Sequence, residues 1–288
     1  MKQRKATASR GIRALARRYN RNKGAVFGFA FLLVLSALAI FADTIAPHDP
    51  MDAGIGPRLE HPGRSFLMGT DNLGRDIFSG VLHGSRISLL IGLSAALTAV
   101  TIGTVVGAVS GYLGGWVDDL LMRGCEVFQT MPRFLFALVI VVFFGSSIWN
   151  VVVVIGLLGW PQTARMVRSE FLHLRESELV LSARALGVGH LRIIFVHLLR
   201  NVFHIIVVTG TLEIGTAIIT EAGLSYLGAG DPNMVSWGRM LYDSQRFLRD
   251  AWWFSVFPGM AVFLTVLSWN LLGDGLNDAL NPRMMRNM

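Results

Sequence analysis

Two acidic residues stand in an otherwise apolar stretch of this sequence. Glu213 and Glu221 interrupt a run from residue 202 to 222 that is long enough to cross a bilayer. An ionised side chain near the centre of a membrane helix costs about 2.5–3.5 kcal/mol on insertion scales, so it usually faces protein or water. Both are therefore candidate residues of a translocation path. For Glu213 a bond to a neighbouring helix is an equally good interpretation, and Glu221, nearer the span boundary, is interpreted as structural.

The sequence carries no catalytic or metal-binding constellation. Its seven histidines are scattered, and neither His-Glu-x-x-His nor a nucleophile elbow is present. The three lysines are Lys2, Lys5 and Lys23, so no Walker A phosphate loop can form and any ATP must be bound by another subunit. The single cysteine, Cys125, is interpreted as a small packing residue. We expect no catalytic residue, no metal site and no cofactor in this chain.

A charged, helix-patterned segment from residue 165 to 201 separates two apolar runs. Its second half places apolar residues at positions i, i+3, i+4, i+7 and i+8 of one helical face: Leu191, Ile194, Phe195, Leu198 and Leu199. The run Gly187-Val188-Gly189 predicts that one helix stops and another starts. We therefore predict two short helices that meet at a glycine corner. A connection of this length is expected to be folded and to contact another molecule.

The elements that hold these residues must be membrane helices. The chain has 288 residues, of which 52% are hydrophobic and 16% charged, well below the roughly 25% charged residues of soluble domains. Nine of the 26 lysines and arginines lie in residues 1–23 without any acidic residue. This basic tail abuts an apolar run, which favours a positive-inside topology signal over nucleic-acid binding. The composition indicates a polytopic membrane protein that lies in a lipid bilayer.

The apolar runs predict an all-α fold with six transmembrane helices, at residues 24–42, 87–112, 120–144, 148–162, 202–222 and 252–273. The first is long for the h-region of a signal peptide, so it is interpreted as an uncleaved anchor. Small residues in 87–112 should let helices approach closely, Pro132 should kink 120–144, and Trp160-Pro161 should end the fourth span. The predicted core domain is 86–274, with residues 275–288 as a C-terminal tail.

Charge distribution predicts which side of the membrane each connection occupies. The segment 165–201 carries six arginines that are not part of a span, whereas the connections 43–85 and 223–251 carry three each, roughly matched by acidic residues. The bias places 165–201 and both termini in the cytoplasm and the connections 43–85 and 223–251 outside. Within the first of these, Asp71 and Asn72 are expected to cap a helix after a turn.

Several stretches resemble one family of membrane transporters. The run Leu181 to Gly187, followed by His197 to Arg200, resembles the EAA motif of ABC importer permeases, in which Glu-Ala-Ala and Gly precede Ile-x-Leu-Pro. Leu181 and Arg200 stand where that motif has Glu and Pro. The runs 69–76, 84–89, 224–228, 236–238 and 270–283 are similar to the C-type subunit of the dipeptide, oligopeptide and nickel permease family.

The resemblance implies the type I ABC importer permease fold in a cell inner or plasma membrane. It also implies the partners: a second homologous permease, two ABC ATPases that bind ATP and Mg²⁺, and an external substrate-binding protein. The ATPase contact is expected at the glycine corner, on Ser182, Ala183, Arg184, Ala185, Leu186, Gly187, Val188, Gly189 and His190. The family moves dipeptides, longer peptides, nickel complexes and other small solutes, and we favour peptides because no His or Met cluster argues for nickel. The rival from another class is a secondary transporter that uses Glu213 as a proton site.

Overall fold

The computed structural model describes Tyr19 and residues 22–280, and the regular structure in this part of the chain is helical. Short helices are α3 (Ala42–Ile45), α8 (Glu178–Ala185), α9 (His190–Arg192), η1 (Ile193–Leu198), η2 (Ser225–Ala229), α11 (Trp237–Ser244) and η3 (Gln245–Phe247). Long helices are α2 (Lys23–Ile40), α4 (Ile77–Leu113), α5 (Gly115–Thr130), α6 (Arg133–Phe144), α7 (Ile148–Arg175), α10 (Leu199–Leu224) and α12 (Trp252–Leu280). Nearly all of the predicted basic tail and residues 281–288 lie outside the described residues.

In the part of the chain that the structure describes, four helical segments are long and apolar enough to cross a membrane: Lys23–Ile40, Ile77–Leu113, His190–Ala229 and Trp252–Leu280. A fifth is present if α5 and α6, which meet at a bend of 83°, form one broken span. The predicted kink at Pro132 is thus a full break in the helix. The predicted count of six spans is not confirmed, because α7 is not among these segments.

No helix end lies at Trp160-Pro161, where the fourth span is predicted to end. Helix α7 continues through Pro161 to Arg175, so the first part of the segment 165–201 belongs to it. A proline removes one helical hydrogen bond, and membrane helices tolerate this loss where neighbouring helices pack closely. Helix α4 supplies that packing: a Cβ atom on Gly103 would lie 2.6 Å from Thr163 Cβ, and one on Gly111 would lie 2.6 Å from Phe171 Cβ. The predicted close approach through small residues is confirmed.

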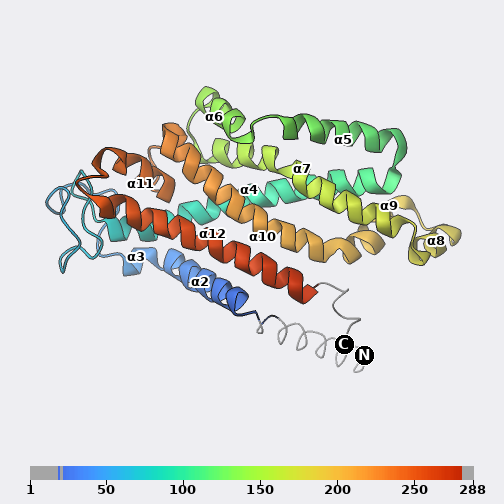
Figure 1. Ribbon diagram of the computed structural model, residues 1–288, viewed down its shortest axis with the longest axis horizontal. Helices are drawn as coiled ribbons and strands as arrows, with labels where there is room; N and C mark the ends of the chain where they lie inside the picture. The colour runs from blue at the N-terminus through green and yellow to red at the C-terminus, as the bar shows by residue number, and fades with distance from the viewer. Residues whose placement is uncertain (1–18, 20–21, 281–288) are drawn as a thin grey trace.

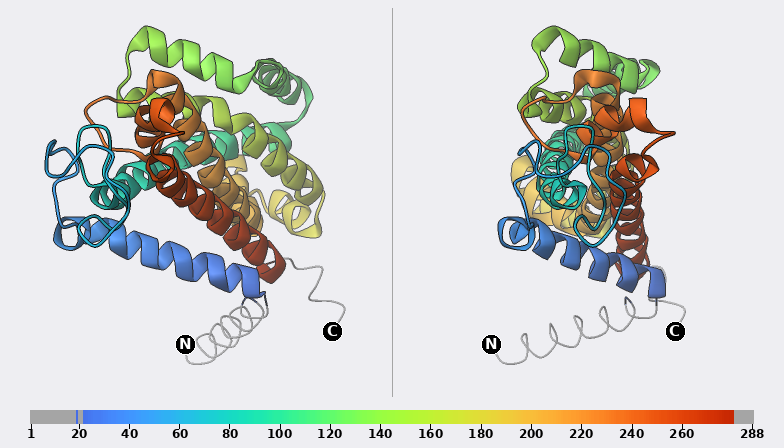
Figure 2. Two further views of the ribbon diagram at one scale, coloured as in Figure 1. Left: turned by 60° about the vertical axis from the view of Figure 1, so that its left-hand side comes forward. Right: turned by 90° about the vertical axis from the view of Figure 1, so that its left-hand side faces the viewer.

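The long helices run side by side and leave two distinct ends (Figure 1). Residues 46–76, α3 and α11 gather at one, the loop end, whereas α8 and α9 lie at the other, the corner end. The start of α2 and the last turns of α12 also point toward the corner end. Figure 2 shows α2 along one side of the bundle and the α5–α6 arm (Gly115–Phe144) along the opposite side.

The connection between α3 and α4 is shorter than the predicted connection 43–85, because α4 already begins at Ile77. The cap is Asp76, whose carboxylate accepts hydrogen bonds from the backbone N–H groups of Phe78 and Ser79. Asp71 instead closes the preceding turn by accepting from two backbone N–H groups at 2.8 Å each. The predicted cap at Asp71 and Asn72 is therefore wrong: Gly74, with φ +74°, reverses the chain before the helix can start.

Candidate functional site

The glycine corner predicted from sequence is present between α8 and α9. Helix α8 ends at Ala185 with Leu186 as its C-cap, and Gly187 adopts the left-handed conformation, with φ +72°. The N–H of Gly187 donates to the carbonyl of Arg184, and the N–H of Val188 donates to that of Ala183. These two bonds form a Schellman motif, which ends a helix at a glycine and pairs its last carbonyl groups. The corner is thus a defined turn and not a loose loop.

The corner presents its backbone and side chains outward. Of the nine residues of the predicted contact, Ala183 is buried and Val188 half-buried, and the other seven are exposed. Leu186 is 83% exposed, and added Cβ atoms at Gly187 and Gly189 would meet nothing within 4 Å. An apolar side chain that is this exposed beside open glycines suits a contact with a partner.

The predicted apolar stripe of the second helix is only half correct. Ile194 and Leu198 are buried, but Leu191 and Phe195 are 72% and 52% exposed, and Ile193 is buried in their place. The cause is the π-helical segment η1, in which each turn takes up more residues than in an α-helix, so the buried face shifts. This helix is also not short, because α9, η1 and α10 continue into one another.

One buried side chain contacts both flanks of the corner. Tyr112, at the end of α4, shares a hydrogen bond of 2.8 Å between its hydroxyl and Nδ1 of His190. The guanidinium of Arg184 lies 5.1 Å from the centroid of the same ring, within the range of a cation–π interaction. Sequence reasoning missed Tyr112, because no local pattern connects residue 112 to residues 184 and 190.

A second set of polar side chains fixes the neighbouring helix ends. The guanidinium of Arg168 in α7 makes two bonds to the carboxylate of Asp118 in α5, Nε–Oδ1 at 2.5 Å and Nη2–Oδ2 at 2.6 Å. The hydroxyl of Ser110 in α4 also donates to Asp118. Paired N–H···O bonds of this kind fix orientation as well as distance. Helices α4, α5 and α7 are therefore held together behind the corner.

Glu213 is buried in α10 and bonds to a neighbouring helix. Its Oε1 atom accepts a hydrogen bond of 2.6 Å from Nη2 of Arg133, the first residue of α6. Arg133 is partly exposed, and its Nε atom is buried with no partner among the described residues. Gly159 leaves the space for this pair, because a Cβ atom there would collide with both side chains. Arg133 could have been suspected from sequence as an isolated cation in an apolar run.

Glu221 lies in a separate polar cluster at the loop end of α10. Its Oε1 atom accepts hydrogen bonds from Ser225 Oγ at 2.7 Å and Ser236 Oγ at 2.9 Å. Ser236 also caps α11, and a Cβ atom on Gly238 would lie 2.7 Å from Ser225 Cβ. The runs 224–228 and 236–238 thus form a compact structure around one carboxylate. Glu213 and Glu221 have no hydrogen-bond partner in common.

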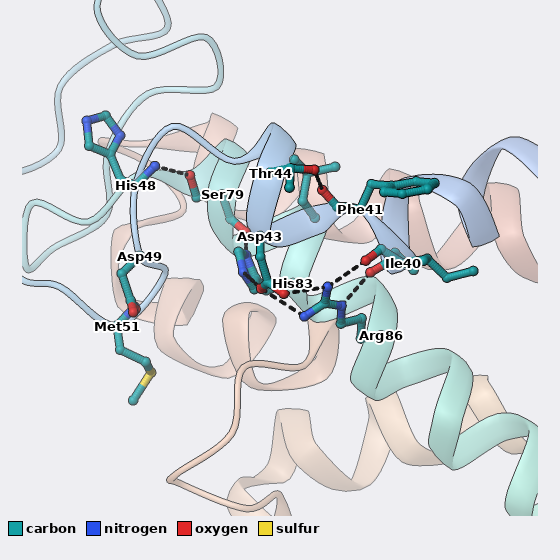
Figure 3. A network of polar contacts seen from close by, with 12 residues as sticks. Ile40, Phe41, Asp43, Thr44, His48, Asp49, Met51, Ser79, His83 and Arg86 are labelled. Carbon is teal, nitrogen blue, oxygen red and sulfur yellow. Dashed lines mark hydrogen bonds and ion pairs between the residues drawn. The ribbon is translucent and has the colours of Figure 1, made fainter.

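The end of α2 and the start of α3 are attached to α4 by polar and charged groups (Figure 3). Arg86 makes two bonds of 2.9 Å to the carboxylate of Asp43 and one of 2.8 Å to the carbonyl of Ile40 at the end of α2. His83 Nε2 lies 3.1 Å from the same carboxylate. The hydrogen bond from Arg86 lowers the pKa of the Asp43 carboxyl. The run 84–89 therefore contains a residue that binds the end of α2 to α4.

A cavity of about 150 Å³ opens at the loop end between residues 50–77, α11 and α12. Asp71, Arg75, Arg239 and Asp243 lie in its wall. Burial raises the pKa of Asp71 and of Asp243. The formal charges of these two acidic and two basic side chains balance. Among the described residues no group of three or more His, Cys, Asp or Glu side chains could hold a metal ion.

Comparison with known proteins places these features in a family. Residues 103–286 match the family described as binding-protein-dependent transport system inner membrane component, and residues 12–62 match the N-terminal TM domain of oligopeptide transport permease C. A putative peptide permease protein of Brucella suis is 40% identical over 93% of this chain and 90% of its own length.

Two further relatives are similar over comparable lengths. The dipeptide transport system permease protein DppC of Alkalihalophilus pseudofirmus is 38% identical over 96% of this chain and 92% of its own. The glutathione transport system permease protein GsiD of Pectobacterium atrosepticum is 41% identical over 93% of this chain and 90% of its own length. This chain therefore belongs to the binding-protein-dependent transport system inner membrane component family and is a membrane-embedded permease of the ABC importers, with the type I importer permease fold.

Proposed function

We propose that this chain is one of two permease subunits of an ATP-driven importer of di- and oligopeptides. A second homologous permease would complete the translocation path, two ATPase subunits would bind ATP and Mg²⁺, and an external binding protein would deliver substrate. The names of relatives, which include peptide, dipeptide and glutathione permeases, support a peptide substrate. Nickel complexes or other small solutes of the same family are the alternative.

The observation that carries the proposal is the exposed corner from Ser182 to His190. Its Schellman turn gives a fixed shape, and its open glycines let a partner approach the backbone. We infer that this corner lies in the cytoplasm, together with both termini, and docks into an ATPase subunit. ATP-driven closure of the two ATPases would push it and open the path toward the outside.

The ion pair between Arg133 and Glu213 supports a structural role for Glu213 over direct contact with substrate. The carboxylate already has a basic partner at 2.6 Å and is buried. A secondary transporter would instead use Glu213 as a proton site. Uptake by this chain alone, driven by an ion gradient and abolished in Glu213→Gln, would favour that class and contradict an ATP-driven importer.

The corner is tested by Gly187→Glu. A non-glycine residue in the left-handed region costs about 1–3 kcal/mol, and the added side chain occupies the docking face, so we expect transport to fall about ten-fold or more. The protein should still insert. ATPase recruitment to membranes and substrate uptake are the measurements.

Two control variants separate strain from blocked docking. Gly54 has a similar φ, +76°, and equally open surroundings, but lies at the loop end, so Gly54→Glu should leave recruitment unchanged. Gly189 is in the corner without a positive φ, and Gly189→Glu should reduce recruitment through blocked docking alone. Normal recruitment and transport in Gly187→Glu would contradict the assignment of the corner.

A further inference from the structure

Two kinds of contact join the exposed corner to the rest of the chain. Apolar packing holds Val180, Ala183 and Ile193 against the bundle, but such packing is non-directional. Among the described residues, the side-chain contacts of the corner that also fix direction are the His190 hydrogen bond and the Arg184 cation–π interaction, and both end on Tyr112. A displacement of either flank therefore reaches the same side chain.

Tyr112 is well placed to pass such a displacement on. It is 3% exposed and is the second-last residue of α4, which runs without a break from Ile77 to Leu113. At 1.5 Å per residue, a helix of 37 residues spans about 55 Å. Its other end lies at the loop end, where the indole N–H of Trp237 donates a hydrogen bond of 2.9 Å to the carbonyl of Val81 in α4. One helix thus connects the corner to the opposite end of the molecule.

We propose that Tyr112 is a positioning residue that couples movement of the corner to α4, an inference that rests on the proposed ATPase contact at the corner. Arg184 and His190 hold the corner in one orientation on the tyrosine, and α4 moves with it. The bundle behind is stiffened by the bonds of Asp118 to Arg168 and Ser110. The Tyr112 hydroxyl, and not only its ring, is required for this coupling.

The test is Tyr112→Phe in the full importer, reconstituted with both permeases, the ATPases and the binding protein in proteoliposomes. This variant keeps the buried ring and removes the bond to His190. A hydrogen bond of this kind contributes enough to shift a two-state equilibrium roughly five-fold. We expect ATPase recruitment to stay normal while substrate transported per ATP hydrolysed falls by about that factor.

The controls use residues that the chain provides. Tyr226→Phe removes a hydroxyl from an exposed tyrosine at the loop end and should leave transport per ATP unchanged. His190→Gln, whose amide can still bond to the tyrosine hydroxyl, should retain more coupling than His190→Leu. The double variant Tyr112→Phe/His190→Leu should lose no more coupling than the worse single variant, because both remove the same bond.

The possible outcomes keep this inference distinct from the proposed function. Normal recruitment with normal transport per ATP in Tyr112→Phe overturns the role of Tyr112 and leaves the corner as the ATPase contact. Lost ATPase recruitment in Tyr112→Phe also overturns the inference, because Tyr112 would then be needed for binding of the ATPase and not for coupling. Normal recruitment and transport in Gly187→Glu would instead contradict the corner as the ATPase contact, on which this inference rests. If Tyr112→Phe reaches the membrane poorly, the two His190 variants provide the test instead. Substrate transported per ATP hydrolysed is then compared between His190→Gln and His190→Leu, and equal values overturn the inference.

Discussion

At the scale of single residues, the ion pair between Arg133 and Glu213 determines how α6 sits on α10. Both groups are largely removed from water, so each depends on the other for compensation of its charge. Glu213→Gln leaves the guanidinium without its carboxylate, and we expect the free energy of unfolding to fall by about 3 kcal/mol. This value lies at the low end of the range for broken buried ion pairs, because Arg133 is partly exposed. Thermal unfolding in detergent measures it.

The double variant Arg133→Gln/Glu213→Gln serves as the control for that loss. It removes both charges, so it should recover a large part of the stability lost in the single variant. Uptake across several substrates gives a second measurement. A changed substrate profile in Glu213→Gln at unchanged stability would contradict the structural role and return Glu213 to the path.

Sequence predicted those residues whose role is local. Gly187 was identified because a helix stop needs a residue that adopts positive φ, and its neighbours in sequence are enough to show that. The partners of Glu213 and of His190 were not predicted, since Arg133 and Tyr112 are 80 and 78 residues away along the chain. Pairings over such separations depend on how the helices pack.

At the scale of elements, the contact between α4 and α7 depends on glycines spaced four residues apart, at 103, 107 and 111. We predict that Gly107→Val forces the helices apart, because a Cβ atom there would collide with the carbonyl of Ala164. Overpacking of this kind costs about 1–3 kcal/mol, seen as a lower melting temperature. Gly124→Val is the matched control, because Gly124 lies within helix α5 with open space around it. Equal melting temperatures for both variants would contradict this account.

The same contact explains why element boundaries were harder to predict than element types. A proline beside a tryptophan predicts a helix end, yet α7 passes through Pro161 because α4 packs tightly against it. The predicted span starts at residue 87, ten residues after α4 begins, since residues 77–86 contain polar groups that tertiary bonds satisfy. Ser79 bonds to Asp76, and Arg86 bonds to Asp43. Hydrophobicity alone cannot show such compensation.

At the scale of the whole molecule, the two ends differ in character. The corner end also holds the start of α2 and the end of α12, whereas the loop end holds residues 46–76 and α11 (Figure 1). This arrangement agrees with the charge bias of the sequence, which is strongest at the N-terminus and in 165–201. The membrane orientation itself remains a prediction from that bias.

Labelling of single cysteines tests this orientation. The native Cys125 is fully buried, so the parent protein should react little with an impermeant maleimide. We expect Gly54→Cys to be labelled in intact cells and Ala185→Cys only after the membrane is opened. Labelling of Ala185→Cys from outside would reverse the orientation and exclude the corner as an ATPase contact.

The π-helical turn at Ile193–Leu198 lies between the corner and α10, and it changes which helical faces the two present. An α-helix turns about 100° with each residue, so a wider turn that takes up one additional residue shifts by about that angle which residues before it share a face with those after it. The direction in which Leu191 faces is therefore set separately from the face that α10 buries.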